Sequence, residues 1–279
     1  MHILDFKKKI HEIEKLKKEK DFSFSKLSEL FNLPSISGIC ELYFNNYPFF
    51  MLNISNDDAV VLKYLWRNFY EELSLNLWYK ITRREGAFFD IGSHTGIYSI
   101  VGNLNNDKNK IISIEAFFLN YSRLLTNLKI KKIPSNNCYL AAASNENGIA
   151  KFKVKSPHGY HSSGGKISEN GKYTVSKIKI DDFNLNTEVK GIKIDTEGHE
   201  FQVMKGSEKI INRDKPDIIF EINEPSFDMC INLLKKYKYN FYFLDEVNKK
   251  IEKVDKFQIN LLRPEGSNCI ATVNETWIN

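Results

Sequence analysis

The residues best placed for chemistry form a glycine-containing stretch, residues 88–96, with the sequence Phe-Phe-Asp-Ile-Gly-Ser-His-Thr-Gly. The apolar residues before Gly92 predict the end of a buried strand, and Ile97 begins a stretch with helical spacing. Gly92 and Gly96 allow a tight turn, so the free N–H groups at the helix start can bind an anionic or strongly polar group. Asp90, just before the turn, can accept hydrogen bonds from an ammonium group or from fixed loop amides.

The spacing of these glycines argues against two common nucleotide sites. It is G-x-x-x-G, whereas dinucleotide-binding proteins carry G-x-G-x-x-G, and the sequence contains no G-x-x-x-x-G-K-[ST]. A nicotinamide-dependent enzyme and a P-loop NTPase are therefore disfavoured.

Acidic residues mark the carboxyl ends of the predicted strands, which is the edge where open α/β sheets bind ligands. Glu115 ends the second predicted strand, where it can accept hydrogen bonds from both ribose hydroxyls of a nucleoside. Any one such acid is also compatible with a solvated strand end, but the glycine loop beside Glu115 favours a binding role. The four acids at this edge are Asp90, Glu115, Asp195 and Glu221.

The same edge offers a possible magnesium site. Asp195 ends the fourth predicted strand, and Glu221 and Asn223 lie at the end of the fifth, so three oxygen ligands could meet over one pocket. Mg²⁺ keeps several waters, needs few protein ligands, and lowers the pKa of a bound hydroxyl. We keep this site as an alternative to catalysis without a metal.

Length and composition are those of a globular protein with one α/β domain and an appendage, since 279 residues with 42% hydrophobic residues can bury a sizeable core. The net charge of +5 suits anionic small substrates but falls short of a nucleic-acid footprint. The four cysteines form no C-x-x-C pair, which is typical of reduced thiols in a cytoplasmic protein. Because no apolar run approaches 18 residues, we expect no transmembrane segment.

Residues 1–80 are predicted to form a helical cap or oligomerisation region. Residues 2–20 have the spacing of an amphipathic helix that packs on its own domain or on a second subunit of a homodimer. Its lysines also allow weak contact with a membrane surface. Residues 22–50 are expected to form loops and short helices, and residues 57–80 one long helix.

Residues 81–279 are predicted to form the α/β domain, because strands and helices alternate there as they do over a parallel sheet. Two extended arms, 149–155 and 173–180, flank a polar, glycine-rich loop near 156–172, which we expect to be mobile. The predicted strands are 87–91, 110–115, 138–143, 191–195 and 217–221, with 241–244 and 269–273 as antiparallel or edge strands. The predicted helices are 95–104, 118–130, 200–211 and 226–237.

Three motifs together resemble the FkbM-type S-adenosylmethionine-dependent methyltransferases. They are residues 89–96, Ile114-Glu115-Ala116, and the K-I-D-T-E-G-H-E block at 193–200. The resemblance covers roughly residues 84–224, and the third motif is its specific part, since the glycine loop occurs in most class I methyltransferases. It implies a class I, Rossmann-like fold: a mostly parallel seven-stranded sheet with one antiparallel strand. It also implies O-methyl transfer, commonly to a sugar hydroxyl in glycan or natural-product assembly.

The resemblance further implies where S-adenosyl-L-methionine binds. The glycine loop and Asp90 would hold its methionine end, Glu115 its ribose, and the residues after Glu115 its adenine. The implied cofactor-binding residues are Asp90, Gly92, Ser93, His94, Thr95, Gly96, Glu115, Ala116, Phe117, Ala143 and Asp195.

The block at 195–200 would lie beside the methyl group. Methyl transfer to oxygen is an in-line displacement, so the enzyme must align the acceptor and remove or share its hydroxyl proton. His199 is the first candidate for the general base because an unperturbed histidine titrates near neutrality. Asp195 and Glu197 are the alternatives for this role or for orienting the acceptor.

These features predict an O-methyltransferase of a nucleotide- or lipid-linked sugar in bacterial surface polysaccharide or glycan biosynthesis. His158, Tyr160 and His161 of the loop near 156–172 could close over that sugar. A polyketide or another small hydroxylated molecule is an alternative acceptor, and a non-catalytic cofactor-binding scaffold is an alternative to an enzyme. A nucleic-acid acceptor is disfavoured, since the sequence has no N-P-P-[YF] tetrapeptide.

Overall fold

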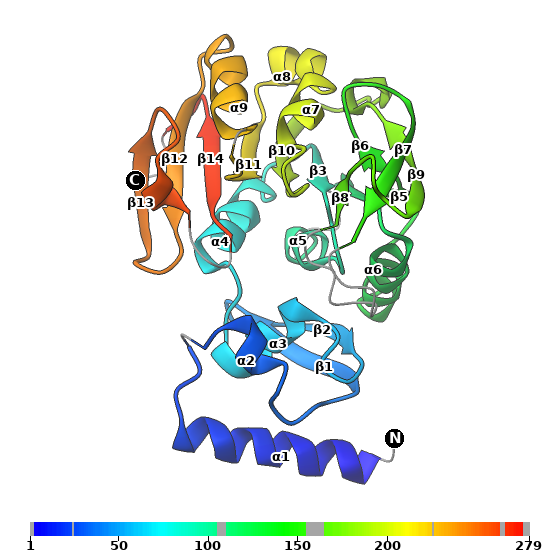
Figure 1. Ribbon diagram of the computed structural model, residues 1–279, viewed down its shortest axis with the longest axis vertical. Coiled ribbons are helices and arrows are strands. Elements are labelled where there is room, and N and C mark those ends of the chain that lie inside the picture. The colour runs from blue at the N-terminus through cyan, green and yellow to red at the C-terminus, as the bar shows by residue number, and fades with distance from the viewer. Residues whose placement is uncertain are drawn as a thin grey trace.

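An eight-stranded sheet forms the centre of the computed structural model, which describes residues 3–23, 25–104, 110–154, 165–224, 226–262 and 266–275 (Figure 1). The strand order is β13-β12-β14-β11-β10-β3-β4-β5. The parallel strands are β3 (Ala87–Ile91), β4 (Lys110–Glu115), β5 (Cys138–Leu140), β10 (Val189–Ile194) and β11 (Asp217–Glu221). The remaining strands, β12 (Asn240–Asp245), β13 (Lys250–Val254) and β14 (Asn268–Thr272), pair antiparallel with their neighbours.

This sheet confirms the class I, Rossmann-like fold. Without β13 it contains seven strands, of which β14 alone runs opposite to the others. The strand β13 adds an eighth at the edge, which the sequence did not predict. The central strand β3 is buried at every residue, as expected of a parallel strand covered on both faces.

Helices cover both faces of the sheet. Side chains alternate along β3, so Phe88 packs toward one face and Phe89 toward the other. On the Phe88 side lie α4 (Glu72–Ile81), α5 (Ile97–Gly102) and α6 (Phe118–Ile130), and on the Phe89 side lie α7 (Glu200–Lys205), α8 (Glu208–Asp214) and α9 (Ser226–Lys235) (Figure 1).

The region before the sheet is not wholly helical, and this part of the prediction was wrong. Residues expected to be loops and short helices form an antiparallel hairpin with alternating buried side chains. Asn45 and Asn46, both with positive φ, make the two-residue turn that hairpins favour. The elements here are α1 (Ile3–Glu19), α2 (Leu27–Leu30), β1 (Gly38–Phe44), β2 (Tyr47–Asn53) and α3 (Ala59–Arg67).

The single helix predicted over residues 57–80 is two helices, α3 and α4. Asn68 ends α3 in the left-handed conformation with φ 69°, and Glu71 precedes α4 with φ 39°. The apolar face of α1 packs on its own chain, since Ile13 is buried in the cluster that also contains Phe88. A homodimer contact and a membrane contact stay predictions.

A smaller sheet, in the order β6-β9-β7-β8, stands beside the end of β4. It confirms the two extended arms as β7 (Gly148–Lys153) and β9 (Tyr173–Ile178), which pair antiparallel. The predicted third strand is divided between the sheets, because β5 ends at Leu140 and β6 (Ala142–Ala143) pairs with β9. The other strand is β8 (Lys166–Ile167). Part of the predicted mobile loop lies outside the described residues. His158, Tyr160 and His161 all belong to that part.

The helix predicted over residues 200–211 is interrupted at Gly206, which separates α7 from α8. A Cβ atom on Gly206 would lie 1.9 Å from the carbonyl oxygen of Ser144, so only glycine permits this close approach. Short 3₁₀ helices cover Ile180–Asp182 and Ile259–Leu261. Among the described residues, no helix combines the length and the apolar character needed to cross a membrane.

Candidate active site

A cavity of about 320 Å³ opens at the carboxyl ends of β3, β4, β10 and β11. The N-terminal region closes one side of it through residues of α3 and of the segment before α4. Of the predicted site residues, the cavity is lined by Asp90, Gly92, Ser93, His94, Glu115, Ala116, Ala143, Asp195, Glu197, His199 and Glu221. Thr95, Gly96, Phe117 and Asn223 are not among its lining residues.

The glycine loop is held tightly between two strand ends. The N–H groups of Gly92 and Ser93 donate to the carbonyl of Ile114 at 2.8 and 3.1 Å. Gly92 has φ 76°, and a Cβ atom there would lie 1.7 Å from the carbonyl oxygen of Asp195. The loop therefore joins β3, β4 and β10 in one rigid edge, which only a glycine at this position allows.

Thr95 and Phe117 serve the structure around the cavity. The carbonyl of Thr95 accepts a hydrogen bond from Asn127 Nδ2 of α6 at 2.8 Å. Phe117 is buried in the cluster that packs the small sheet, with its ring 6.3 Å from that of Phe152. Their direct contact with a cofactor stays a prediction.

Asp90 is a buried carboxylate below the loop, 1% exposed. Its Oδ2 accepts a hydrogen bond from Ser99 Oγ at 2.5 Å. Burial raises the pKa of Asp90 to about 6, although Ser99 and the charge of Lys193 act in the opposite direction. Because burial disfavours the ionised form of Asp90, a positively charged ligand or neighbour stabilises its carboxylate.

Glu115 is anchored by backbone amides. Its Oε2 accepts from the N–H of His94, and its Oε1 from the N–H of Phe117, both at 2.8 Å. Burial raises the pKa of Glu115, and these amides partly offset that effect. The carboxylate is thus fixed at the cavity wall, in the place where the sequence predicted ribose binding.

A buried lysine, which sequence reasoning did not select, lies at the centre of the acidic residues. Lys193 is 1% exposed, and its Nζ lies 3.4 Å from Asp195 Oδ2 and 3.1 Å from Asn268 Oδ1. Burial acts to lower the pKa of Lys193, but the carboxylates of Asp195, Glu71 and Glu221 outweigh it and raise that pKa. The spacing Lys-x-Asp on one strand places both side chains on the same face, and this signal was present in the sequence.

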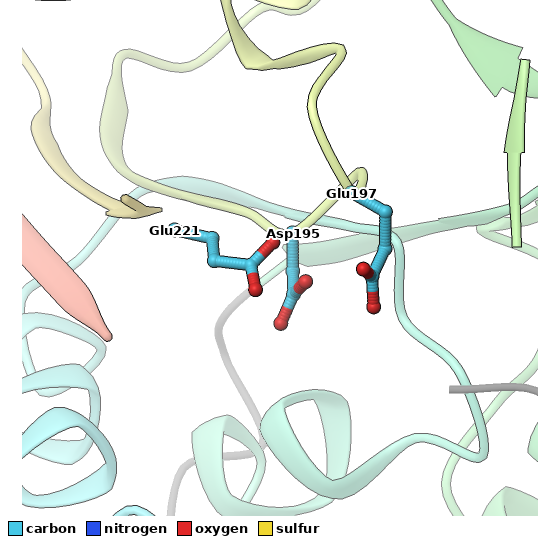
Figure 2. A group of neighbouring side chains, drawn as sticks. All are labelled: Asp195, Glu197 and Glu221. Atoms are coloured by element: carbon cyan, nitrogen blue, oxygen red, sulfur yellow. The ribbon is translucent and has the colours of Figure 1, made fainter. Parts of the chain in front are cut away.

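Three carboxylates meet beside Lys193. Oxygens of Asp195, Glu197 and Glu221 lie within 4.8 Å of one another. Figure 2 shows Asp195 and Glu197 extending from the turn after β10, and Glu221 extending toward them from the end of β11. The cluster contains Asp195 and Glu221 of the predicted ligand trio and adds Glu197 to them. Asn223, the third predicted ligand, donates through Nδ2 to Glu221 Oε2 at 2.5 Å.

Glu200 explains how Glu197 is held in place. Glu197 has φ 55°, in the turn between β10 and α7. Glu200 is fully buried, and its Oε1 accepts hydrogen bonds from the N–H groups of Thr196 and Gly198 at 3.1 and 3.0 Å. Glu200 thus fixes the turn that carries Glu197.

The acidic cluster changes the titration of Glu221. Burial in the cavity wall, together with the negative charges of Asp195 and Glu197, raises the pKa of Glu221 well above its ordinary value. A carboxylate with a raised pKa is suited to exchange a proton near neutral pH.

His199 lines the cavity but is turned toward a neighbouring segment. Its Nε2 lies 3.0 Å from Ser144 Oγ. Burial, with the positive charge of Lys177, lowers the pKa of His199 to about 4. A ring with so low a pKa accepts protons weakly at neutral pH, so the structure favours the carboxylates as bases.

The chain belongs to the FkbM methyltransferase family. The profile of the family described as "Methyltransferase FkbM domain" matches residues 90–241, which is more than half of the chain. The match spans the glycine loop, Glu115 and the whole 193–200 motif. It confirms the resemblance stated from the sequence.

Solved structures with similar folds include other methyltransferases. The methyltransferase FkbM of Methylobacillus flagellatus KT aligns with TM-score 0.45 and 15% identity, over 77% of this chain and 53% of that one, so this chain spans about half its length. The precorrin-6y C5,15-methyltransferase of Geobacter metallireducens GS-15 aligns with TM-score 0.39 and 13% identity, over 72% of this chain and 87% of that one. The tRNA (uracil-54, C5)-methyltransferase of Pyrococcus abyssi, solved with S-adenosyl-L-homocysteine, aligns with TM-score 0.41 and 12% identity, over 84% of this chain and 43% of that one. No curated protein sequence matches the chain.

Proposed function

We propose that this chain is an S-adenosylmethionine-dependent O-methyltransferase. Its proposed acceptor is a nucleotide- or lipid-linked sugar of bacterial surface polysaccharide or glycan biosynthesis. The observation that carries the proposal is a single cavity that joins Glu115 and the glycine loop to the carboxylates of Asp195, Glu197 and Glu221. Membership of the FkbM family supports methyl transfer, and the carboxylates support a hydroxylated acceptor, since they accept hydrogen bonds from hydroxyl groups.

The residues of the cavity fit the cofactor. A volume of about 320 Å³ is within the range of small-molecule sites, about 300 to 1,000 Å³. Glu115 and Asp90 supply acceptors for ribose hydroxyls and for an ammonium group, and Ala142, Ala143 and Phe152 supply apolar wall. When bound, S-adenosylmethionine supplies an electrophilic methyl group on a sulfonium, whose positive charge suits these acidic surroundings.

The side chains of the cluster then divide the work on the acceptor. Glu221, with its raised pKa, takes up the hydroxyl proton, and Asn223 fixes its orientation. Lys193 balances the charge of Asp195, which is left to accept a hydrogen bond from the acceptor and align it. His199 is kept as the alternative base.

Mg²⁺ at the same carboxylates is the second candidate. Three carboxylate oxygens within 4.8 Å of one another are the hard ligands that this ion prefers. Lys193 already places one positive charge beside Asp195 and so competes with a metal there. A non-catalytic scaffold is less favoured, because Asp195 and His199 both line the cavity.

Labelled S-adenosylmethionine, offered with a panel of nucleotide sugars, lipid-linked sugars and polyketide alcohols, tests the proposal. We expect label transfer to a sugar oxygen, at least 100-fold slower in Asp195→Asn and unchanged in the control Glu146→Gln, an exposed carboxylate outside the cavity. Transfer lost with EDTA and restored by Mg²⁺ would establish the metal alternative. Transfer only to polyketide alcohols, or cofactor binding without any transfer, would contradict the proposed acceptor.

A further inference from the structure

Glu71 brings a carboxylate from the N-terminal region to the wall of the cavity. It lies between α3 and α4 and precedes residues 90–241, which match the family profile. Its backbone is left-handed, with φ 39°, a conformation that residues other than glycine seldom adopt. Such a residue keeps this conformation when its contacts hold it in place, so the contacts of the Glu71 side chain are informative.

One oxygen of Glu71 holds two groups of the sheet domain. Its Oε2 accepts a hydrogen bond from Tyr98 Oη of α5 at 2.6 Å and another from Asn268 Nδ2 of β14 at 3.1 Å. Tyr98 and Asn268 are both buried, with 5% and 4% of their surface exposed. A single carboxylate oxygen therefore fixes two side chains that come from opposite ends of the domain sequence.

Both of these side chains contact Lys193. The Oδ1 atom of Asn268 lies 3.1 Å from Lys193 Nζ, and the ring centre of Tyr98 lies 5.1 Å from it. Because an ammonium group only donates, Asn268 must present its oxygen to Lys193 and its Nδ2 to Glu71. Glu71 thus holds Asn268 in the orientation in which it serves Lys193.

The position of Lys193 in turn affects Asp195. Lys193 Nζ lies 3.4 Å from Asp195 Oδ2, farther than from Asn268 Oδ1. A buried ammonium group needs acceptors for its N–H groups. If Asn268 turned away, Lys193 would move closer to Asp195 and occupy the carboxylate that the acceptor hydroxyl needs.

We propose that Glu71 is a positioning residue for methyl transfer. It holds the two groups that contact Lys193, so that Asp195 stays available to align the acceptor hydroxyl. This inference rests on the proposed function, since it takes Asp195 as the residue that contacts the acceptor. Because Glu71 acts through Lys193, its loss should slow the transfer step and leave cofactor binding unchanged.

Steady-state kinetics with labelled S-adenosylmethionine and the sugar of the panel that the wild type methylates fastest test this role. Glu71→Leu should lower kcat about 30-fold or more, since small misplacements of reacting groups are costly. Its KM values, and its Kd for S-adenosylhomocysteine by calorimetry, should stay within about threefold of the wild type. Glu71→Gln keeps an oxygen that can accept both hydrogen bonds, so it should retain about a fifth or more of the wild-type kcat.

A double-mutant cycle shows whether Glu71 acts through Asn268. Asn268→Ala should lower kcat about tenfold or more, and the double variant with Glu71→Leu should be no slower than the slower single variant. Glu72→Gln is the matched control, because Glu72 is the next residue and carries an exposed carboxylate outside the cavity. It should keep the wild-type kcat and KM, and melting curves should show that every variant is folded.

Four results would overturn the role of Glu71 alone: wild-type kcat in Glu71→Leu or in Asn268→Ala, a loss confined to KM, equal losses in Glu71→Gln and Glu71→Leu, or additive losses in the double variant. Asn268→Ala keeps the test decisive if Glu71→Leu does not fold. A wild type that methylates no sugar would overturn the proposed function together with this inference.

Discussion

Charge balance around Lys193 sets the chemistry of single residues in the cavity. One buried ammonium group influences Asp90, Asp195 and Glu221, which come from three neighbouring strand ends. Taking several charges out of water is costly unless each finds a partner, and here one cation serves several carboxylates. The negative charge that Lys193 leaves unbalanced would suit the sulfonium of the proposed cofactor.

Asp90→Asn should stabilise the protein without ligand while weakening cofactor binding. In the folded state, burial raises the pKa of Asp90 to about 6 from its ordinary value of 3.8. The folded state thus binds more protons than the unfolded one in this window, and stability falls as pH rises through it. Removing the charge should therefore gain about 1 to 3 kcal/mol at pH 7.

Urea denaturation between pH 3.5 and 7.5 measures this effect. The variant should show a flatter pH dependence than the wild type between about pH 4 and 6, and no gain below pH 4. Ser99→Ala, which removes the hydroxyl donor to Asp90, should change stability in the opposite direction. Equal stability of wild type and Asp90→Asn at pH 7 would refute the account of this carboxyl group.

Four of the acidic residues that line the cavity could be predicted because they occupy strand ends. Asp90, Glu115, Asp195 and Glu221 follow buried apolar runs, and parallel strands bring such ends to one edge. Lys193 was missed, although its Lys-x-Asp spacing placed it on the same face as Asp195 and so signalled the pair that the two residues form.

At the scale of elements, the turn after β3 controls the geometry of the edge. Gly92 allows the β3 turn to touch the carbonyl of Asp195, and Gly198 allows the turn that carries Glu197. The two glycines differ in one respect: around Gly198 a Cβ atom would meet nothing within 4 Å. Alanine substitutions at the two glycines therefore separate the free-energy cost of backbone strain from that of steric conflict.

Gly92→Ala should lower stability by more than 3 kcal/mol or prevent folding, because strain and a conflict with a fixed carbonyl combine. Gly198→Ala should cost only about 1 kcal/mol, from its φ of 101° alone. Thermal and urea unfolding of both variants compare the two costs. Similar losses in the two variants would contradict the close contact between the β3 turn and β10.

The elements of the sheet domain were predicted well because their apolar runs are long and regularly spaced. Helix α6 was predicted with both ends correct, and β3, β4 and β11 likewise. The hairpin β1–β2 was missed, although Asn45-Asn46 between alternating apolar residues is a turn signal. The breaks at Asn68 and Gly206 depend on tertiary contacts and backbone conformation that periodicity does not reveal.

For the molecule as a whole, the N-terminal region and the sheet domain share one core. Ile13 and Phe49 belong to the same hydrophobic cluster as Phe88 and Ile270. Arg123 of α6 pairs with Asp57 at 2.7 Å, both nearly inaccessible to solvent. The cavity wall contributed by α3 is thereby fixed to the helix that follows Glu115.

Arg123→Met should therefore destabilise the protein by about 3 to 5 kcal/mol, since it leaves the Asp57 charge buried without its partner. Lys205→Met, which removes the more exposed ion pair with Glu208, is the control and should cost less than about 1 kcal/mol. Urea denaturation at pH 7 compares them. Equal costs would show that the two regions are held together by other contacts.

A crystal structure with S-adenosylhomocysteine tests the central claim most directly. We predict that the ribose hydroxyls lie within hydrogen-bond distance of Glu115, with the sulfur atom directed toward Asp195, Glu197 and Glu221. A ligand bound elsewhere, or one whose sulfur faces away from these carboxylates, would contradict the account.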